Sequence, residues 1–459
     1  MRFPHNARDE RSMTQQNTPR TGAKSPGPKF RNRTRKAGER SGPTGKPGPD
    51  PTRDLAFDIV CGVVEHRRML ETTLDRSTVS DPRDRASAHR LAATTLRHMG
   101  SMTELLQPML RREPPEPVRC ALLLGVAQLL HLETPPHAAV GTIVDLLRRR
   151  GLAPFAGLAN AVLRRVSREG KGLLEGLDEA RLDVPAWLWS AWGSRARAIS
   201  RGLHREAPLD LTIRPGATAP EGGELLPTGT VRYPAGTRMT ALEGFEEGAF
   251  WAQDVAAAMP VRLLGDVNGK RVIDLCAAPG GKTAQLATAG AKVTAVEREE
   301  TRVTRLQENF ARLKLEAETV VADALEWKPS EPADAVLLDA PCSATGTLRR
   351  HPDVLWVKRP RDVVALAEGQ DALIDAAREM LRPGGTLLYA VCSLQDEEGP
   401  DRVRAAVERG GWTHEPFTED ELSMMSAART PEGFFRTHPG LWVEQGGMDG
   451  FFAARLIRT

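Results

Sequence analysis

The sequence has few of the features that mark secreted or membrane-spanning proteins. Its 459 residues contain no run of about eighteen apolar residues, and the N-terminus lacks the apolar core of a secretion signal. Only five cysteines are present (61, 120, 276, 342 and 392), and no two of them have the spacing of zinc or thioredoxin motifs. We therefore expect a cytoplasmic protein with reduced thiols, no membrane association and no bound metal.

The positive charge is confined to one end of the chain. The net charge is +3, but residues 1–50 carry twelve Lys+Arg against four Asp+Glu, and the remainder carries 51 against 56. Residues 20–51 are rich in Gly, Pro, Ser, Thr and Arg, so they cannot bury enough apolar surface to fold. We predict that residues 1–50 are a basic, disordered arm, which either binds nucleic acid or is a solvated tail without a specific role.

The rest of the chain is long enough for several packed cores. Residues 51–170 have apolar side chains three and four positions apart and prolines between these stretches, which predicts an all-α domain of five or six helices. Residues 171–250 are mixed and rich in proline, with strand candidates at 209–214 and 230–233. We interpret them as a small α+β connector.

Residues 251–459 alternate short β-branched runs with helical segments, which predicts a C-terminal α/β domain with a parallel, Rossmann-like sheet. The predicted strands are 271–275, 292–296, 318–321, 335–338 and 386–391. A further strand at 451–457 follows a turn at 446–450, and we expect it to form a hairpin with a strand near Trp442. Closure by such a hairpin is typical of the class I methyltransferase variant of the doubly wound fold.

A glycine-rich loop follows the first of these strands. Residues 274–283 place small side chains where a ligand must approach the backbone. A phosphate-binding P-loop would need glycine where Cys276 stands, and the two closely spaced glycines of a dinucleotide site are absent. Glu297 ends the second strand and could accept from both ribose hydroxyls, while Asp323 ends the third and could accept from an adenine amino group. The pattern favours a nucleoside cofactor over a purely structural turn.

Two cysteines follow neighbouring strands, Cys342 after the fourth and Cys392 after the fifth. Carbon 5 of cytosine is too weak a nucleophile to accept a methyl group directly, so a thiolate must first add to carbon 6 and later be expelled. One cysteine would form this bond and the other would help to break it. Asp339 could act as the acid at the base or bind the cofactor's amine, and the sequence leaves both roles open. Cys61 and Cys120 lie on apolar helical faces and are interpreted as small buried residues.

Cations gather downstream of Cys342. Residues 349–352 contain Arg349 and Arg350, and Lys358 and Arg359 follow. We expect these side chains to contact the phosphates of an RNA strand whose target base is extruded, with a charged surface loop as the alternative.

These motifs resemble the Nol1/Nop2/Sun family of RNA 5-methylcytosine methyltransferases, and the resemblance covers nearly the whole chain. The matching segments are 250–254, 274–283, 339–346, 351–353, 389–393 and 449–452. Segments 124–129 and 160–164 resemble the NusB-like RNA-binding domain that a ribosomal RNA branch of the family carries. The residue before Cys392 is usually Thr in the family and is Val391 here, and the second-strand acid is usually Asp and is Glu297 here.

The resemblance implies S-adenosylmethionine as cofactor, Cys392 as nucleophile and Cys342 as the residue that assists product release. The cofactor site would consist of Cys276, Ala277, Ala278, Pro279, Gly280, Gly281, Lys282, Glu297, Asp323 and Asp339. The implied substrate is a cytosine of small-subunit (16S) ribosomal RNA, bound by a protein that we expect to be monomeric. A tRNA cytosine and a non-catalytic RNA-binding role are the alternatives.

Overall fold

The structure is a computed structural model that describes residues 48–459. Most of the arm predicted at residues 1–50 lies outside the described residues. Within the described part of the chain, no helix is long and apolar enough to cross a lipid bilayer.

The first part of the described chain is entirely helical, as predicted. Asp50 begins α1 by accepting a hydrogen bond from the Arg53 amide at 3.1 Å, and Asp81 begins α3 in the same way through the Arg83 amide at 2.7 Å. The helices are α1 (Pro51–His66), α2 (Leu70–Asp75), α3 (Pro82–Arg97), α4 (Met99–Leu106), α5 (Glu116–Leu130), α6 (Pro136–Arg149) and α7 (Ala156–Glu175). Residues 48–175 thus form seven α-helices, and the prediction of five or six was wrong. The short helix α2 and the break between α3 and α4 at His98 leave no interruption in the apolar pattern of the sequence, so it could not reveal them.

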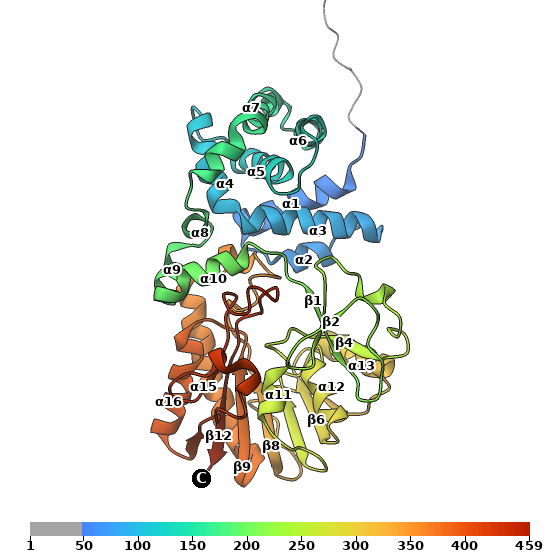
Figure 1. The fold of residues 1–459 in the computed structure, drawn as a ribbon, viewed down its shortest axis with the longest axis vertical. Helices are drawn as coiled ribbons and strands as arrows, with labels where there is room; N and C mark the ends of the chain where they lie inside the picture. The colour runs from blue at the N-terminus through green and yellow to red at the C-terminus, as the bar shows by residue number, and fades with distance from the viewer. Residues whose placement is uncertain (1–47) are drawn as a thin grey trace, which may run out of the picture. The chain divides into compact units, whose positions relative to one another are not determined.

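Helix α5 lies at the centre of this bundle and contacts α1, α3, α6 and α7 (Figure 1). Gly125 allows α7 to approach closely, because a Cβ atom there would lie 2.6 Å from the Leu163 side chain. The segments 124–129 and 160–164 that resemble a NusB-like domain therefore face each other in the core of the bundle.

A smaller region of helices and strands follows. Its helices are α8 (Glu179–Leu182), α9 (Ala186–Trp192) and α10 (Ala196–Leu203), and its strands are β1 (Leu209–Ile213), β2 (Glu224–Leu225), β3 (Val231–Tyr233) and β4 (Phe250–Ala252). The strands form an antiparallel sheet in the order β2-β3-β1-β4, and β1 and β3 are the two strands predicted here. A buried ion pair joins Arg232 on β3 to Asp210 on β1 at 2.7 Å.

The C-terminal part is a single mixed sheet with helices on both faces (Figure 1). Its strands are β5 (Arg271–Leu275), β6 (Lys292–Glu297), β7 (Glu318–Val321), β8 (Ala333–Asp339), β9 (Leu381–Val391), β10 (Trp412–Glu415), β11 (Phe435–Arg436) and β12 (Phe452–Arg458). Its helices are α11 (Met259–Leu263), α12 (Gly281–Thr288), α13 (Glu300–Leu313), α14 (Val354–Val357), α15 (Pro360–Met380) and α16 (Pro400–Arg409). The order is β10-β12-β9-β8-β5-β6-β7, with β9 to β7 parallel. The predicted α/β fold is confirmed.

Successive residues of the central strands bury their side chains on opposite faces of the sheet. Leu337 of β8 and Leu388 of β9 pack in a cluster with α11 and α12. The next residues, Leu338 and Tyr389, pack in a second cluster with α15 and α16. Because both faces are covered, the edge formed by the carboxyl ends of the parallel strands is the place where a ligand can reach the sheet.

The predicted hairpin with a strand near Trp442 was wrong. Strand β12 instead runs antiparallel between β9 and β10. The two-residue strand β11 also pairs with the first two residues of β12. Trp442 has a φ of +50°, and Gly446 and Gly447 also have positive φ, so the chain forms an irregular loop here and not a strand.

The helical bundle contacts the segment between β8 and α15 through hydrogen bonds to the backbone. The Arg97 guanidinium donates to the Arg349 carbonyl at 2.8 Å, and the Trp356 indole donates to the Leu96 carbonyl at 2.8 Å. The Leu70 amide donates to the Asp353 carboxylate at 2.9 Å. The end of α3 is therefore tied to the chain that follows Cys342.

Candidate active site

The loop after β5 brings backbone to the carboxyl edge of the sheet. Cys276 and Gly280 have φ values of +59° and +98°, and α12 begins at Gly281. A side chain at Gly280 would be strained by this φ and would lie 3.1 Å from Leu306 of α13. Ala277 and Ala278 are buried, so the turn leaves backbone groups beside the start of a helix, where a polar ligand can approach.

Two of the predicted acids lie at the next strand ends. Glu297 is 4% exposed at the end of β6, and one of its carboxylate oxygens accepts from the amides of Arg298 and Glu299. Its second oxygen is 3.0 Å from the Arg302 guanidinium but has no partner with hydrogen-bond geometry in residues 48–459. Asp323, beyond β7, is half-buried and accepts from the Leu325 amide at 2.9 Å.

Lys282 and Asp339 form an ion pair across this edge. Lys282 Nζ on α12 lies 2.6 Å from Asp339 Oδ2 at the end of β8, and the ammonium also stands over the Phe451 ring at 4.9 Å. Burial alone would lower the pKa of Lys282, but the Asp339 carboxylate outweighs it and the pKa is raised. The lysine is therefore a fixed cation beside Asp339.

The two strand-end cysteines meet in space. Strands β8 and β9 are parallel neighbours, and Cys342 Sγ and Cys392 Sγ are 3.4 Å apart, both half-buried. The pKa of Cys342 is raised well above its usual value by its hydrogen bond to Cys392, by burial and by the charge of Cys392. Cys342 thus remains a thiol that can donate to the sulfur of Cys392. Burial, together with the charge of Glu297, raises the pKa of Cys276 to about 12, which makes it a poor nucleophile.

Comparison with known proteins places the chain in a family. A family model described as 16S rRNA methyltransferase RsmB/F matches residues 261–457, and a NusB family model matches residues 50–168. Ribosomal RNA small subunit methyltransferase B of Cronobacter sakazakii is 35% identical over 435 residues, which cover 88% of this chain and 98% of that protein. The chain belongs to the small subunit methyltransferase B family. The Pseudomonas putida relative of the same name is 36% identical over 87% of this chain and 96% of its own length.

Family membership confirms the resemblance predicted from the motifs, and the chain is a methyltransferase. The solved structure of PH0851 has a TM-score of 0.68 and 22% identity, and the match covers 90% of this chain and all of that one. This match supports the fold along nearly the whole chain.

Sequence reasoning missed Glu398, which lies behind the cysteines. This fully buried carboxylate accepts from the Ser343 amide at 2.8 Å and from the hydroxyls of Ser343 and Ser393 at 2.5 Å. Ser343 and Ser393 directly follow the two cysteines, so one carboxylate holds both cysteine loops of the candidate site. An acid five residues beyond Ser393 was the only signal in the sequence, and it resembled its exposed neighbours Asp396 and Glu397.

The prediction that Arg349 binds phosphate was wrong. Its side chain is 1% exposed and pairs with Asp254 at 3.2 Å and Asp449 at 3.5 Å. Arg350 is partly exposed, but its guanidinium is also held by Asp449, at 2.5 Å. Arg349 therefore joins the approach segment 250–254 to the segment 449–452, whereas Arg350 and Arg359 are exposed.

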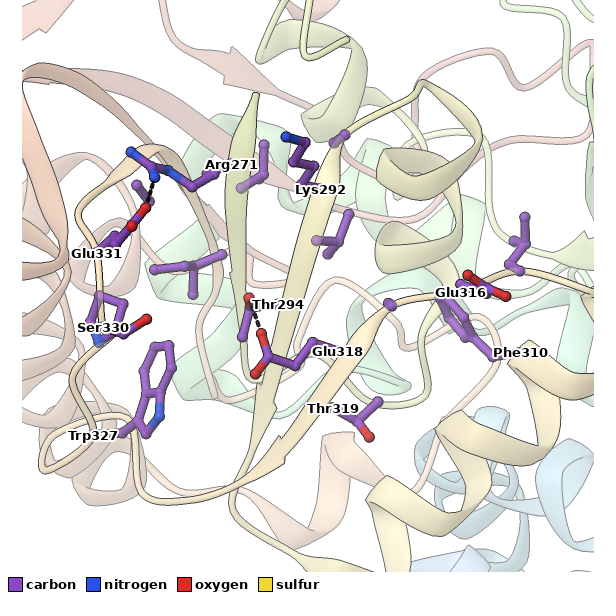
Figure 2. A pocket seen from close by; sticks show the side chains of 18 of the residues that line it. Arg271, Lys292, Thr294, Phe310, Glu316, Glu318, Thr319, Trp327, Ser330 and Glu331 are labelled. Atoms are coloured by element: carbon purple, nitrogen blue, oxygen red, sulfur yellow. Dashed lines mark hydrogen bonds and ion pairs between the residues drawn. The ribbon is translucent and has the colours of Figure 1, made fainter. Parts of the chain in front are cut away.

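A cavity of about 1070 Å³ lies elsewhere on the sheet (Figure 2). Its lining includes Arg271, Lys292 and Glu318, which begin β5, β6 and β7. Figure 2 shows Glu318 turned toward Thr294, whose hydroxyl donates to it at 2.8 Å. Because the cavity lies at the amino ends of the parallel strands, it is on the opposite edge from Cys276, Glu297 and Asp339 and is not the candidate active site described above.

Proposed function

We propose that this methyltransferase transfers a methyl group from S-adenosylmethionine to carbon 5 of a cytosine in small-subunit ribosomal RNA. The observation that carries the proposal is the pair of cysteine sulfurs, 3.4 Å apart at neighbouring strand ends and next to the Lys282–Asp339 ion pair. Methylation of a cytosine carbon needs a thiol that adds and a second group that helps to release it, and methylation of an amine needs neither.

The residues at the carboxyl edge fit the cofactor. The Glu297 oxygen that lacks a hydrogen-bond partner within the described chain suits a ribose hydroxyl, and the turn at Gly280 admits the ligand to the backbone. We assign the cofactor site to Cys276, Ala277, Ala278, Pro279, Gly280, Gly281, Lys282, Glu297, Asp323 and Asp339. When bound there, the cofactor supplies an electrophilic methyl group on a sulfonium sulfur.

Cys392 forms the covalent bond in the proposed mechanism. Its thiolate adds to carbon 6 of cytosine, and the electron pair of the carbon 5–carbon 6 double bond moves toward the N3 side of the ring, where a proton is taken up. Asp339 is placed to hold the base or the amine of the cofactor, and Lys282 fixes the position of its carboxylate.

Cys342 acts after methylation. The hydrogen bond and the charge of Cys392 keep the proton on Cys342 in the free enzyme. Once Cys392 is bound to carbon 6 as a thioether, both causes are gone and the pKa of Cys342 falls. Once its own proton has passed to solvent, the Cys342 thiolate can remove the carbon 5 proton. The electron pair of that bond re-forms the carbon 5–carbon 6 double bond, the Cys392 thiolate leaves, and N3 gives up the proton taken up during addition.

The substrate assignment rests on relatives and on the helical bundle. Proteins named ribosomal RNA small subunit methyltransferase B match nearly end to end, and the NusB family model covers the bundle. We propose residues 51–170 as the RNA-binding domain, 171–250 as the connector and 251–459 as the methyltransferase domain. The monomeric state and the cytoplasmic location stay predictions.

The test combines cysteine variants with two RNA substrates. Cys342→Ala incubated with cofactor and unmodified 16S ribosomal RNA is expected to accumulate a covalent protein–RNA band on a denaturing gel. Cys392→Ser is expected to give neither a band nor methyl transfer, and Cys61→Ala, in the helical bundle, to behave as the wild type. If Cys342→Ala turns over normally without a band, the two-cysteine mechanism is refuted. Methylation of tRNA transcripts but not of 16S RNA would refute the substrate assignment alone.

A further inference from the structure

A buried group of histidines lies where the helical bundle meets helices α8 and α10. His98 stands between α3 and α4, Asp183 follows α8, and His204 follows α10. The side chains of His98, Asp183 and His204 are 10%, 2% and 21% exposed. One potential ligand atom from each lies within 4.8 Å of the other two.

The two histidines approach the same carboxylate at ion-pair distance but without hydrogen-bond geometry. Asp183 Oδ2 is 3.6 Å from His98 Nδ1 and 3.1 Å from His204 Nε2. Neither nitrogen has a partner with hydrogen-bond geometry anywhere in residues 48–459. Buried imidazole nitrogens are normally satisfied, so two unpartnered nitrogens aimed at one oxygen indicate that a further group belongs between them.

We propose that His98, Asp183 and His204 bind a zinc ion. Imidazole nitrogen and carboxylate oxygen are ligands that zinc prefers, and with bonds of about 2.0–2.2 Å a tetrahedral site separates its ligand atoms by roughly 3.4 Å. The observed 3.1 and 3.6 Å bracket this value. Ser101 donates to both oxygens of Asp183 and orients the carboxylate, as supporting residues do in metal sites. The ligands stand far apart in the sequence, so their spacing gave no signal of a metal.

The ion joins three segments that lie apart in the chain. It connects the α3–α4 junction of the bundle to the ends of α8 and α10, so it fixes the bundle against the connector. Its position is one residue from Arg97, which donates to the Arg349 carbonyl. The role is structural, and no step of the proposed methyl transfer depends on it.

Metal analysis of the untagged full-length chain tests the proposal. After incubation with Zn²⁺ and removal of the excess, mass spectrometry of the metal content should find about one zinc per chain in the wild type and in His137→Gln, an exposed histidine outside the cluster. His204→Gln and Asp183→Asn should bind zinc at least about 100-fold more weakly, because each removes a ligand. Within the described chain, His204 Nε2 has no contact of hydrogen-bond geometry and approaches only Asp183, so the His204 variant is expected to fold even if Asp183→Asn does not.

Two controls separate this site from other zinc binding. The Cys342 and Cys392 thiols could also hold zinc, so Cys392→Ser must keep its full zinc content. Co²⁺ bound at a tetrahedral nitrogen and oxygen site should give strong visible absorption that His204→Gln lacks. A wild type that takes up no zinc, or a His204→Gln variant that binds it as tightly, would overturn the proposal.

Discussion

Replacing Glu398 by Gln tests whether one buried carboxylate positions both cysteines. The change keeps the shape but places an NH₂ group on one side of the site. If the side-chain oxygen of the introduced glutamine still accepts the hydrogen bond from the Ser343 backbone amide, the new NH₂ group faces the hydroxyls of Ser343 and Ser393. Two charge-assisted hydrogen bonds of about 1.5–3 kcal/mol each are then exchanged for two neutral bonds of about 0.5–1.5 kcal/mol, a net loss of about 2–3 kcal/mol.

This loss should be visible in stability and in turnover. For a domain of this size, about 2–3 kcal/mol lowers the melting temperature by roughly 4–12 °C. Because the hydroxyls must turn away, the cysteine loops shift, and a displacement near 1 Å can reduce kcat by about 100-fold. Thermal unfolding and single-turnover methylation measure both effects, with Glu397→Gln, its exposed neighbour, as the matched control. If Glu398→Gln and Glu397→Gln have equal melting temperatures and rates, Glu398 does not position the cysteines.

Two further predictions concern buried charges. Arg349→Met leaves Asp254 buried without its cation and Asp449 paired with Arg350 alone, and it should cost about 3–5 kcal/mol in urea unfolding. Arg382→Met removes an exposed pair and should cost less than about 1 kcal/mol; equal costs would contradict the assignment of Arg349 to the interior. Burial raises the pKa of Asp274 to about 7, so the folded protein binds the carboxyl proton of Asp274 more tightly than the unfolded chain does. The free energy of unfolding therefore decreases as the pH rises from about 4 to about 7. Asp274→Asn should lose less over this range, and parallel melting curves for both proteins would show that Asp274 does not titrate there.

The sequence predicted strands best where β-branched runs are bounded by turn residues. The runs at 271–275 and 318–321 coincide with β5 and β7, because β-branched residues stand between clear turn signals. The sequence predicted a strand only from residue 386, because Pro383 and the glycines at 384 and 385 resemble a turn. Strand β9 in fact begins at Leu381. In the structure these residues lie within the strand, which shifts its register against β8 between Ala333 and Ala335. Leu381 pairs with Ala333 and pairing resumes at Thr386, so the breaker forms a bulge between two paired stretches and does not end the strand.

The cysteine pair was predictable for a topological reason, and the buried ion network was not. Parallel neighbouring strands bring their carboxyl ends together, so Cys342 and Cys392 had to meet once β8 and β9 were recognised. The environment of Arg349 depends on Asp254 and Asp449, which come from about a hundred positions before and after it. No local pattern separates such an arginine from a surface cation, because both occur in polar segments.

The buried arginine links the helical bundle to Cys392 through one continuous set of bonds. Arg97, at the end of α3, donates to the backbone of Arg349, whose guanidinium pairs with Asp449. The residue after Asp449 donates to the Gly346 carbonyl at 2.8 Å, and the Gly346 amide donates to the Cys392 carbonyl at 3.0 Å. A Cβ on Gly346 would collide with the backbone after Asp449, so these loops cannot separate and re-pack independently. The proposed RNA-binding bundle is therefore held at a fixed offset from Cys392, the proposed nucleophile, and we expect this offset to select the cytosine that is methylated.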